Sequence, residues 1–222
     1  MIFIILFIIQ INAIDTNECF ELINANVVLS ENQLTIKGEG KMCDCYNNKL
    51  TINKENITSL VFQNTVTSVG NKCFMNFMNL TTINFGASIQ EISQYSFYNT
   101  KLSQITIPKS VKSIESNAFG NNKQLESINF EESEDELNIQ PFVFENNEKL
   151  SKIHIPKRLK QFDSNIFEGC YKLKEITVAK DHEKYQVKEN VLFDKEGKKW
   201  LFYPPGLEND FYSIPSTVNE ID

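Results

Sequence analysis

The chain has 222 residues, of which 41% are hydrophobic, and a formal net charge of −7. That much apolar material is enough for one sizeable elongated domain. The negative charge and the lack of a basic stripe argue against a protein that follows nucleic-acid phosphates.

An unbroken apolar run opens the chain at residues 2–9. It is too short to span a bilayer comfortably and is typical of the hydrophobic part of a signal peptide. We therefore expect residues 1–13 to be removed after Ala13, which would place the protein outside the cell, secreted or on its surface. Two features leave an uncleaved anchor as the alternative. Met1 alone precedes the apolar run, without the Lys or Arg that usually opens a signal peptide, and Ile11 is bulky for the third position before a cleavage site. Membrane association is expected only in that case, or if a C-terminal anchor is missing.

Residues 14–56 lack the repeat that follows and are expected to form an N-terminal cap. The apolar segments 27–29 and 34–36 flank a polar turn, which predicts a hairpin. A solenoid needs an atypical end to cover the open core of its first coil.

Three cysteines, Cys19, Cys43 and Cys45, fall within this cap. In a secreted chain they predict one disulfide between Cys19 and either Cys43 or Cys45. A Cys-x-Cys pair can also begin a metal site, but no second cysteine pair or suitably spaced histidine accompanies it, so no metal is expected. The other two cysteines, Cys73 and Cys170, occupy core positions of the repeat.

Two markers recur through residues 57–222 with a period in the twenties. An apolar residue opens each of six units: Ile57, Leu80, Leu102, Leu125, Leu150 and Leu173. A phenylalanine closes five of them: Phe74, Phe97, Phe119, Phe144 and Phe167. This period predicts a leucine-rich-repeat solenoid that is mainly β, with a parallel sheet of short strands, short turns and few helices.

The unit at residues 102–124 shows how one coil is built. Alternation over 105–107 has the period of a strand, and Pro108 removes a donor and ends the pairing. Val111 and Ile114 mark a second short extended piece. The chain then turns back through Phe119, which we expect to stack on the equivalent Phe of each neighbouring coil.

This pattern closely resembles the repeats of BspA-like surface proteins, also called the Treponema pallidum type. The matching positions are 105–108, 111–114, 118–119 and Cys170. The resemblance covers about residues 57–222 and implies a protein-binding surface protein, with an adhesin-like role. Two coils depart from the pattern: Phe85-Gly86 replaces Ile-Pro in the second, and the fourth carries an acidic insertion at 131–136.

The acidic insertion is expected to be a solvated bulge. A run of carboxylates can bind calcium, but this one lacks the Asp-x-Asp-x-Asp-Gly spacing that wraps the cation.

Beyond Leu173 the pattern changes. Segments 191–193 and 198–203 flank a turn that ends at Gly197, which predicts a hairpin. A similar insertion, here near 190–206, occurs between repeats in BspA-like proteins. The period then resumes at 212–221, position for position with 105–114, so the last coil is expected to be truncated.

No enzymatic constellation is present in the sequence. Both histidines, His154 and His182, are expected at the surface, and neither belongs to a triad or a zinc-binding helix. There is also no glycine-rich phosphate loop. We therefore expect no catalysis, no cofactor and no small-molecule substrate.

The expected partner is a protein, from a host or an extracellular matrix, bound through the exposed positions of the repeat strands. These positions flank the buried residue of each strand, and from the second coil onward they are Thr82, Asn84, Gln104, Thr106, Ser127, Asn129, Lys152, His154, Glu175 and Thr177. Ser59 and Val61 are their equivalents in the first coil. Two alternatives remain open: a structural coat or spacer without a specific ligand, and a fragment of a longer surface protein.

Asn56 and Asn79 each begin an N-glycosylation sequon immediately before the first position of a coil. We expect both to be exposed, on the same edge of adjacent coils, and glycosylated in a glycosylating host.

Overall fold

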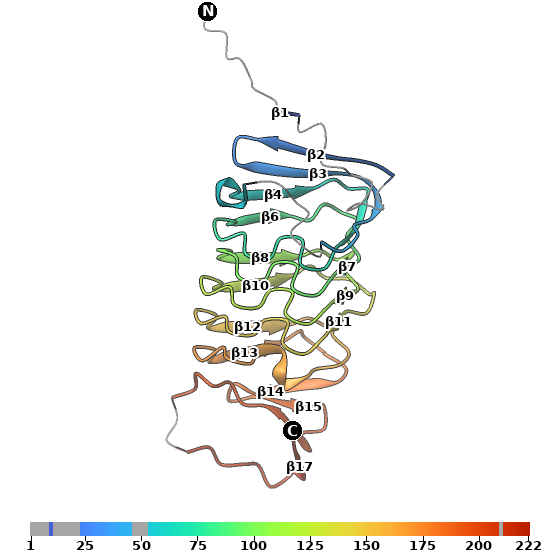
Figure 1. Ribbon diagram of the computed structural model, residues 1–222. Coiled ribbons are helices and arrows are strands. Elements are labelled where there is room, and N and C mark those ends of the chain that lie inside the picture. The colour runs from blue at the N-terminus through green and yellow to red at the C-terminus, as the bar shows by residue number, and fades with distance from the viewer. Residues whose placement is uncertain (1–8, 11–22, 46–52, 209–210) are drawn as a thin grey trace, which may run out of the picture.

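The computed structural model describes residues 9–10, 23–45, 53–208 and 211–222. Figure 1 shows a stack of coils along one axis, with the cap at one end and the C-terminal strands at the other. The first four coils contribute one strand to each of two parallel rows, and the fifth and sixth contribute a strand to the first row only. This confirms the predicted mainly β solenoid.

The first row contains the predicted repeat strands. Its members are β4 (Ser59–Phe62), β6 (Thr82–Asn84), β8 (Gln104–Ile107), β10 (Ser127–Phe130), β12 (Lys152–Ile155) and β13 (Glu175–Val178). Hydrogen-bonded ladders join β4 to β6, β8 to β10 and β12 to β13, all in parallel. The row is therefore continuous in space but interrupted in its ladder between β6 and β8 and between β10 and β12 (Figure 1).

The two interruptions follow the two coils that depart from the repeat pattern. The first follows the coil in which Phe85-Gly86 replaces Ile-Pro, and the second follows the coil with the insertion at 131–136. Irregular backbone at the end of a strand changes how the next strand can pair, so each departure has a local structural effect.

A second row lies across the coil from the first. It consists of β5 (Val66–Val69), β7 (Glu91–Ile92), β9 (Ser113–Ile114) and β11 (Asn138–Ile139), which pair in parallel in that order. An isolated parallel bridge from Leu137 to Leu159 extends it toward the fifth coil. The second extended piece predicted at 111–114 is thus confirmed as β9, and its equivalents form strands in the first, second and fourth coils.

The predicted phenylalanine stack forms the centre of the core. Rings at 74, 97, 119, 144 and 167 follow one another with centroids 5.3–5.8 Å apart and planes inclined by 9–15°. The residues two positions after the first four of these rings are asparagines with positive φ: Asn76, Asn99, Asn121 and Asn146. Asparagine tolerates the left-handed conformation better than most residues, which explains its recurrence at this turn.

The cap consists of an antiparallel hairpin. Strand β2 (Ile23–Ser30) pairs with β3 (Gln33–Lys41), as the sequence predicted, and β3 continues into both rows by pairing in parallel with β4 and β5. The two-residue strand β1 (Ile9–Gln10) lies antiparallel along β2. The rest of the predicted signal peptide lies outside the described residues. A short 3-10 helix, η1 (Lys54–Asn56), leads into the first coil.

The cap is bonded covalently to the first coil, and the cysteine pairing differs from the prediction. Cys45 forms a disulfide with Cys73, so its predicted pairing with Cys19 is wrong. The parallel register of β3 with β5 brings residues 40–45 alongside the first coil, and the Cys45 amide donates to the Asn71 carbonyl at 2.9 Å. Cys19 lies outside the described residues, so its pairing with Cys43 stays a prediction.

At the other end, four strands follow the sixth coil. The predicted hairpin is confirmed as β15 (Val191–Asp194) and β16 (Lys199–Phe202), and the sequence reading missed β14 (Tyr185–Lys188), which pairs with β15. A second 3-10 helix, η2 (Ser164–Phe167), forms the turn of the fifth coil.

The last repeat is only partly regular. Its second piece forms β17 (Glu220–Ile221), parallel to β16, but the segment equivalent to 105–107 is not a strand. Tyr212 instead packs edge-on against Trp200 and Tyr203, with ring centroids 5.2 and 5.7 Å away.

Candidate functional site

The predicted contact residues come together as two parallel lines along the first row of strands. In register, Gln104 lies beside Ser127 and Thr106 beside Asn129, and Lys152 lies beside Glu175 and His154 beside Thr177. All ten are exposed except Ser127, which is half-buried. Ser59 and Val61, in the first coil, are half-buried beside Thr82 and Asn84. We call this surface the strand face.

Charge is unevenly distributed along the strand face. The second to fourth coils present hydroxyl and amide groups, whereas the fifth and sixth add Lys152, His154 and Glu175. The His154 Nδ1 atom lies 2.9 Å from the Thr177 hydroxyl, so a hydrogen bond joins these two coils across the face. Short uncharged groups cost little to desolvate against another protein, while charged groups add selectivity.

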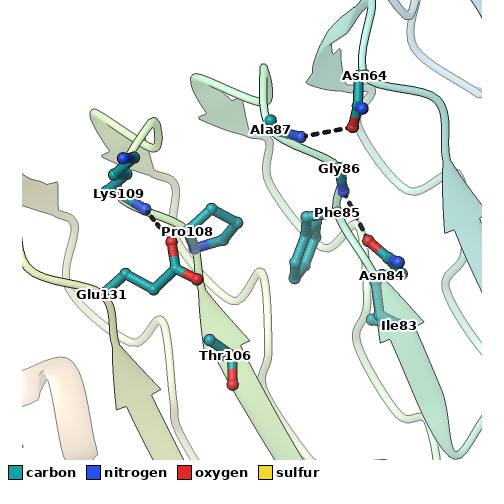
Figure 2. Close-up of a pocket in the computed structure, with 10 residues that line it drawn as sticks. All are labelled: Asn64, Ile83, Asn84, Phe85, Gly86, Ala87, Thr106, Pro108, Lys109 and Glu131. Atoms are coloured by element: carbon teal, nitrogen blue, oxygen red, sulfur yellow. Dashed lines mark hydrogen bonds between the residues drawn. The ribbon is translucent and has the colours of Figure 1, made fainter.

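A cavity of about 490 Å³ opens at one edge of the strand face, where β6 and β8 end. We call it the notch. Figure 2 shows that its walls come from consecutive coils, with Asn64 from the first, residues 83–87 from the second, Thr106 and Pro108 from the third, and Glu131 from the fourth. Ile83 is half-buried here, although its equivalents in the other coils are buried. The notch therefore exposes apolar surface at the edge of a polar face.

Gly86 explains why the notch lies in this coil. Its φ is +65°, and a Cβ placed on it would lie 2.7 Å from the Phe62 carbonyl oxygen, so no other residue fits without a shift of the backbone. The equivalent position in the third coil is Pro108, whose ring supports the opposite wall (Figure 2). The replacement of Ile-Pro by Phe85-Gly86 was visible in the sequence, but its consequence for the surface was missed.

Hydrogen bonds fix the polar groups of the notch. The Asn64 Oδ1 atom accepts from the Ala87 amide at 3.0 Å, and Asn84 Oδ1 accepts from the Gly86 amide at 2.9 Å (Figure 2). Both side-chain carbonyls are therefore occupied by backbone donors, and the NH₂ group is the donor that each asparagine still carries at the notch. From the fourth coil, Glu131 accepts a hydrogen bond from the Lys109 amide at 3.0 Å through one carboxylate oxygen.

Arg158 lies beneath the wall of the notch and beside the acidic insertion. It is only 1% exposed, and its guanidinium donates to the carbonyls of Val111 at 2.6 Å, Pro108 at 3.0 Å and Lys109 at 3.4 Å. These acceptors belong to the third coil although Arg158 belongs to the fifth. Burial lowers the pKa of Arg158, and the nearby carboxylates of Glu132, Glu131 and Asp135 oppose that shift. The insertion is exposed as predicted, but its charge also balances a buried cation that the sequence reading did not identify.

The two histidines differ in their surroundings. His154 is exposed, as predicted, but the prediction for His182 is wrong because His182 is 1% exposed. Its Nδ1 atom accepts from the amides of Lys184 and Tyr185, at 3.2 and 3.3 Å, and its ring packs on Tyr185. These local hydrogen bonds close the turn into β14, which accounts for its burial.

Asn56 and Asn79 are both exposed, at the edge of the strand face opposite the notch, where β4 and β6 begin. The Asn79 side chain donates to the Glu55 carbonyl at 2.8 Å, so its amide is partly engaged.

Within the described residues, no cluster of three or more histidine, cysteine or carboxylate side chains is placed to hold a metal ion. In the same part of the chain, no helix has the length and apolar character needed to cross a membrane.

Stacked coils with two parallel rows of strands and a continuous core define a leucine-rich-repeat solenoid. The sequence matches the BspA type leucine rich repeat region over residues 47–174 and 131–191, in six copies. The chain therefore belongs to the BspA-type leucine-rich-repeat family, as the repeat pattern indicated. No curated protein matches the chain.

Several solved structures share the fold. The pneumococcal vaccine antigen PcpA aligns at 21% identity with a TM-score of 0.70, over 89% of this chain and 58% of that one. A leucine rich cell surface protein from Faecalibacterium prausnitzii aligns at 22% identity with a TM-score of 0.60, over 87% of this chain and 63% of that one. A T. pallidum leucine rich repeat protein aligns at 18% identity with a TM-score of 0.53, over 66% and 74%. The chain thus spans less than two thirds of the first two proteins, and at these identities the likeness concerns the fold alone.

Proposed function

We propose that this chain is a secreted or cell-surface protein-interaction module that binds a host or matrix protein through its strand face, in an adhesin-like role. The observation that carries the proposal is the exposed, largely uncharged strand face beside the notch, on a rigid stack of coils. Membership of the BspA-type family and the similarity to a pneumococcal vaccine antigen and a Faecalibacterium cell surface protein support surface placement. The proposal includes no catalytic role and no cofactor, in keeping with a repeat fold that serves as a binding scaffold.

Binding of the purified chain to fixed host cells and to immobilised matrix proteins tests this proposal. Two variants alter the strand face, Gln104→Lys with Thr106→Glu, and Lys152→Glu with His154→Glu. A control that matches the first of these variants, Asn138→Lys with Gln161→Glu, adds one charge of each sign at exposed positions outside the strand face. All substituted side chains are exposed, so we expect each variant to fold with stability within about 0.5 kcal/mol of the parent.

We expect the two strand-face variants to lose at least about tenfold in affinity, or 1.4 kcal/mol, while the control binds normally. Undiminished binding by both strand-face variants would exclude this surface as the site. A parent chain that binds no cell or matrix protein would favour the alternative role, a coat or spacer without a specific ligand.

A further inference from the structure

The notch has the features of a pocket for one side chain of a partner, at the edge of the strand face. Its floor is apolar, from Ile83, Phe85 and Pro108, and its volume of about 490 Å³ is large enough for an aromatic or large aliphatic side chain. Interfaces commonly draw most of their binding energy from such central anchors.

The hydrogen-bonding groups at the rim favour a peptide backbone beside that side chain. Asn64 and Asn84 present NH₂ donors because their carbonyls are held by the Ala87 and Gly86 amides. Thr106, a strand-face residue that also lines the notch, adds an exposed hydroxyl. Donors placed around an apolar floor match the carbonyl groups of an extended segment.

Charge determines which kind of segment fits. From Glu131, which lines the notch, the fourth coil continues with four more acidic residues up to position 136. Glu136, at the far end of this run, shares a surface hollow with Lys112, Lys160 and Lys184, and the Lys112 ammonium lies 3.5 Å from Asp135. Nearer the notch, the exposed carboxylates of Glu131, Glu132 and Glu134 stand against Lys109, and Arg158 is buried. The surface beside the notch therefore carries a net negative charge.

We infer that the notch receives a large apolar side chain from an extended, basic segment of a partner protein, with a Lys or Arg of that segment over residues 131–136. This inference rests on the proposed function and specifies its partner. The apolar cavity receives the side chain, and the acidic insertion favours basic segments among those that could enter the cavity.

The test uses four synthetic nine-residue peptides and the full chain. The peptides combine a central phenylalanine or serine with flanking lysines or glutamates, and fluorescence anisotropy gives each Kd at low ionic strength. We expect the phenylalanine–lysine peptide to bind most tightly, roughly tenfold better than either peptide that lacks one of these features.

Two pairs of variants locate the binding. Thr106→Trp fills the notch, whereas Asn129→Trp adds the same side chain at the neighbouring position of the next strand. We expect the first to weaken the phenylalanine–lysine peptide at least tenfold and the second to leave its Kd within twofold. Replacing Glu132 and Glu134 by Gln should weaken that peptide roughly threefold, while the same change at Glu148 and Glu196 should not.

The inference is overturned if the four peptides bind with equal affinity or if none binds with a Kd below about 1 mM. It is also overturned if the two Trp variants have equal effects. The assay contains no cells or matrix protein, so its failure leaves the strand-face result standing. If the strand-face variants bind host cells and matrix proteins undiminished, the peptide site can still stand. It stands if Thr106→Trp abolishes peptide binding and Lys152→Glu with His154→Glu leaves peptide binding unchanged.

Discussion

Asn122 is a polar side chain at the centre of an apolar core. It is completely buried, three residues after the stacked Phe119. Its NH₂ group donates to the carbonyls of Phe97 and Phe119, at 3.0 and 2.9 Å, and its Oδ1 atom accepts from the amide and hydroxyl of Thr100. Asn147 repeats the arrangement one coil later and accepts from the Asn122 amide at 3.0 Å. These side chains satisfy the backbone where each coil turns.

Replacing Asn122 by Ala should cost about 3 kcal/mol or more, because it leaves several buried carbonyl and amide groups without partners at about 1–3 kcal/mol each. Urea denaturation followed by circular dichroism measures the loss. Asn129→Ala, on the strand face, is the matched control and should change stability by less than about 0.5 kcal/mol. Similar unfolding midpoints for both variants would show that the buried amide is not needed.

Cys170 occupies the same turn position in the fifth coil, where its thiol donates to the Phe144 carbonyl at 3.1 Å. Burial raises the pKa of Cys170 to about 12, so the thiol stays protonated at physiological pH. Its role is that of a small buried donor, and it is not a reactive nucleophile.

His182 predicts a pH dependence of stability. Burial, chiefly, lowers its pKa below the ordinary value, and the positive charges of Lys160 and Lys195 act in the same direction. The folded state therefore favours the neutral ring, whereas the unfolded chain takes up a proton near pH 6.5. Stability from this residue is complete above about pH 6.5 and is lost as the pH falls through the folded-state pKa.

His182→Asn tests this dependence, because the amide oxygen can accept the same two backbone hydrogen bonds but does not titrate. We expect the parent to lose more stability than the variant between pH 7 and about pH 5.5, measured by urea denaturation at each pH. Gln161→Asn, a control at an exposed position, should keep the parental slope. Identical slopes for the parent and His182→Asn would contradict the expectation.

At the scale of the element, the phenylalanine stack holds neighbouring coils together. Phe119 lies between Phe97 and Phe144, at 5.3 and 5.8 Å, so its removal leaves a cavity that touches three coils. We expect Phe119→Ala to cost about 3–5 kcal/mol, and Glu134→Ala, in the exposed insertion, less than about 0.5 kcal/mol. Equal shifts in melting temperature for the two variants would contradict this account of the core.

The Cys45–Cys73 disulfide links the cap hairpin to the first coil across 28 residues of sequence. Closing a loop of that length stabilises a protein by about 3.5 kcal/mol, chiefly by restricting the unfolded chain. We expect Cys45→Ser with Cys73→Ser to raise amide hydrogen exchange in β3, β4 and β5, with little change in β12 and β13. Uniform acceleration along the whole solenoid, or none, would contradict a local role for this bond.

Elements with a repeated pattern could be predicted, and single elements could not. The markers at Leu102 and Phe119 have copies in neighbouring coils, so one misread coil could not change the fold. Strand β14 occurs once, with charged residues before and after it, and had no copy to reveal it. The predicted strand at 212–214 failed because Tyr212 packs on Trp200 in preference to continuing the row.

The candidate site shows the same limit. Successive side chains of a strand point to opposite faces of its sheet. The alternation of apolar and polar residues therefore predicted that Gln104, Thr106 and their equivalents lie on the exposed side. The notch is lined by Asn64, Gly86 and Glu131, which lie in three different coils. The Cys45–Cys73 bond likewise depends on how the cap meets the first coil, which spacing alone does not determine.

At the scale of the whole molecule, the two sequons and the notch lie at opposite edges of the strand face. We therefore expect glycans at Asn56 and Asn79 of protein secreted from a glycosylating host, with occupancy lower at Asn79 because its amide donates to Glu55. Gel mobility before and after glycosidase treatment, with Asn56→Gln and Asn79→Gln as single variants, measures this. Unchanged mobility of the parent would contradict it, and the phenylalanine–lysine peptide should bind the glycosylated and bare forms alike.

Arg158 has a consequence for how the stack comes apart. In an ideal linear array each repeat interacts only with its two neighbours, so the ends can fray one unit at a time. A side chain that reaches from the fifth coil to three carbonyls of the third adds a second-neighbour term to the contacts that each coil makes with the next. The middle of the array then behaves as one block of three coils, and fraying that begins at either end meets its largest step there.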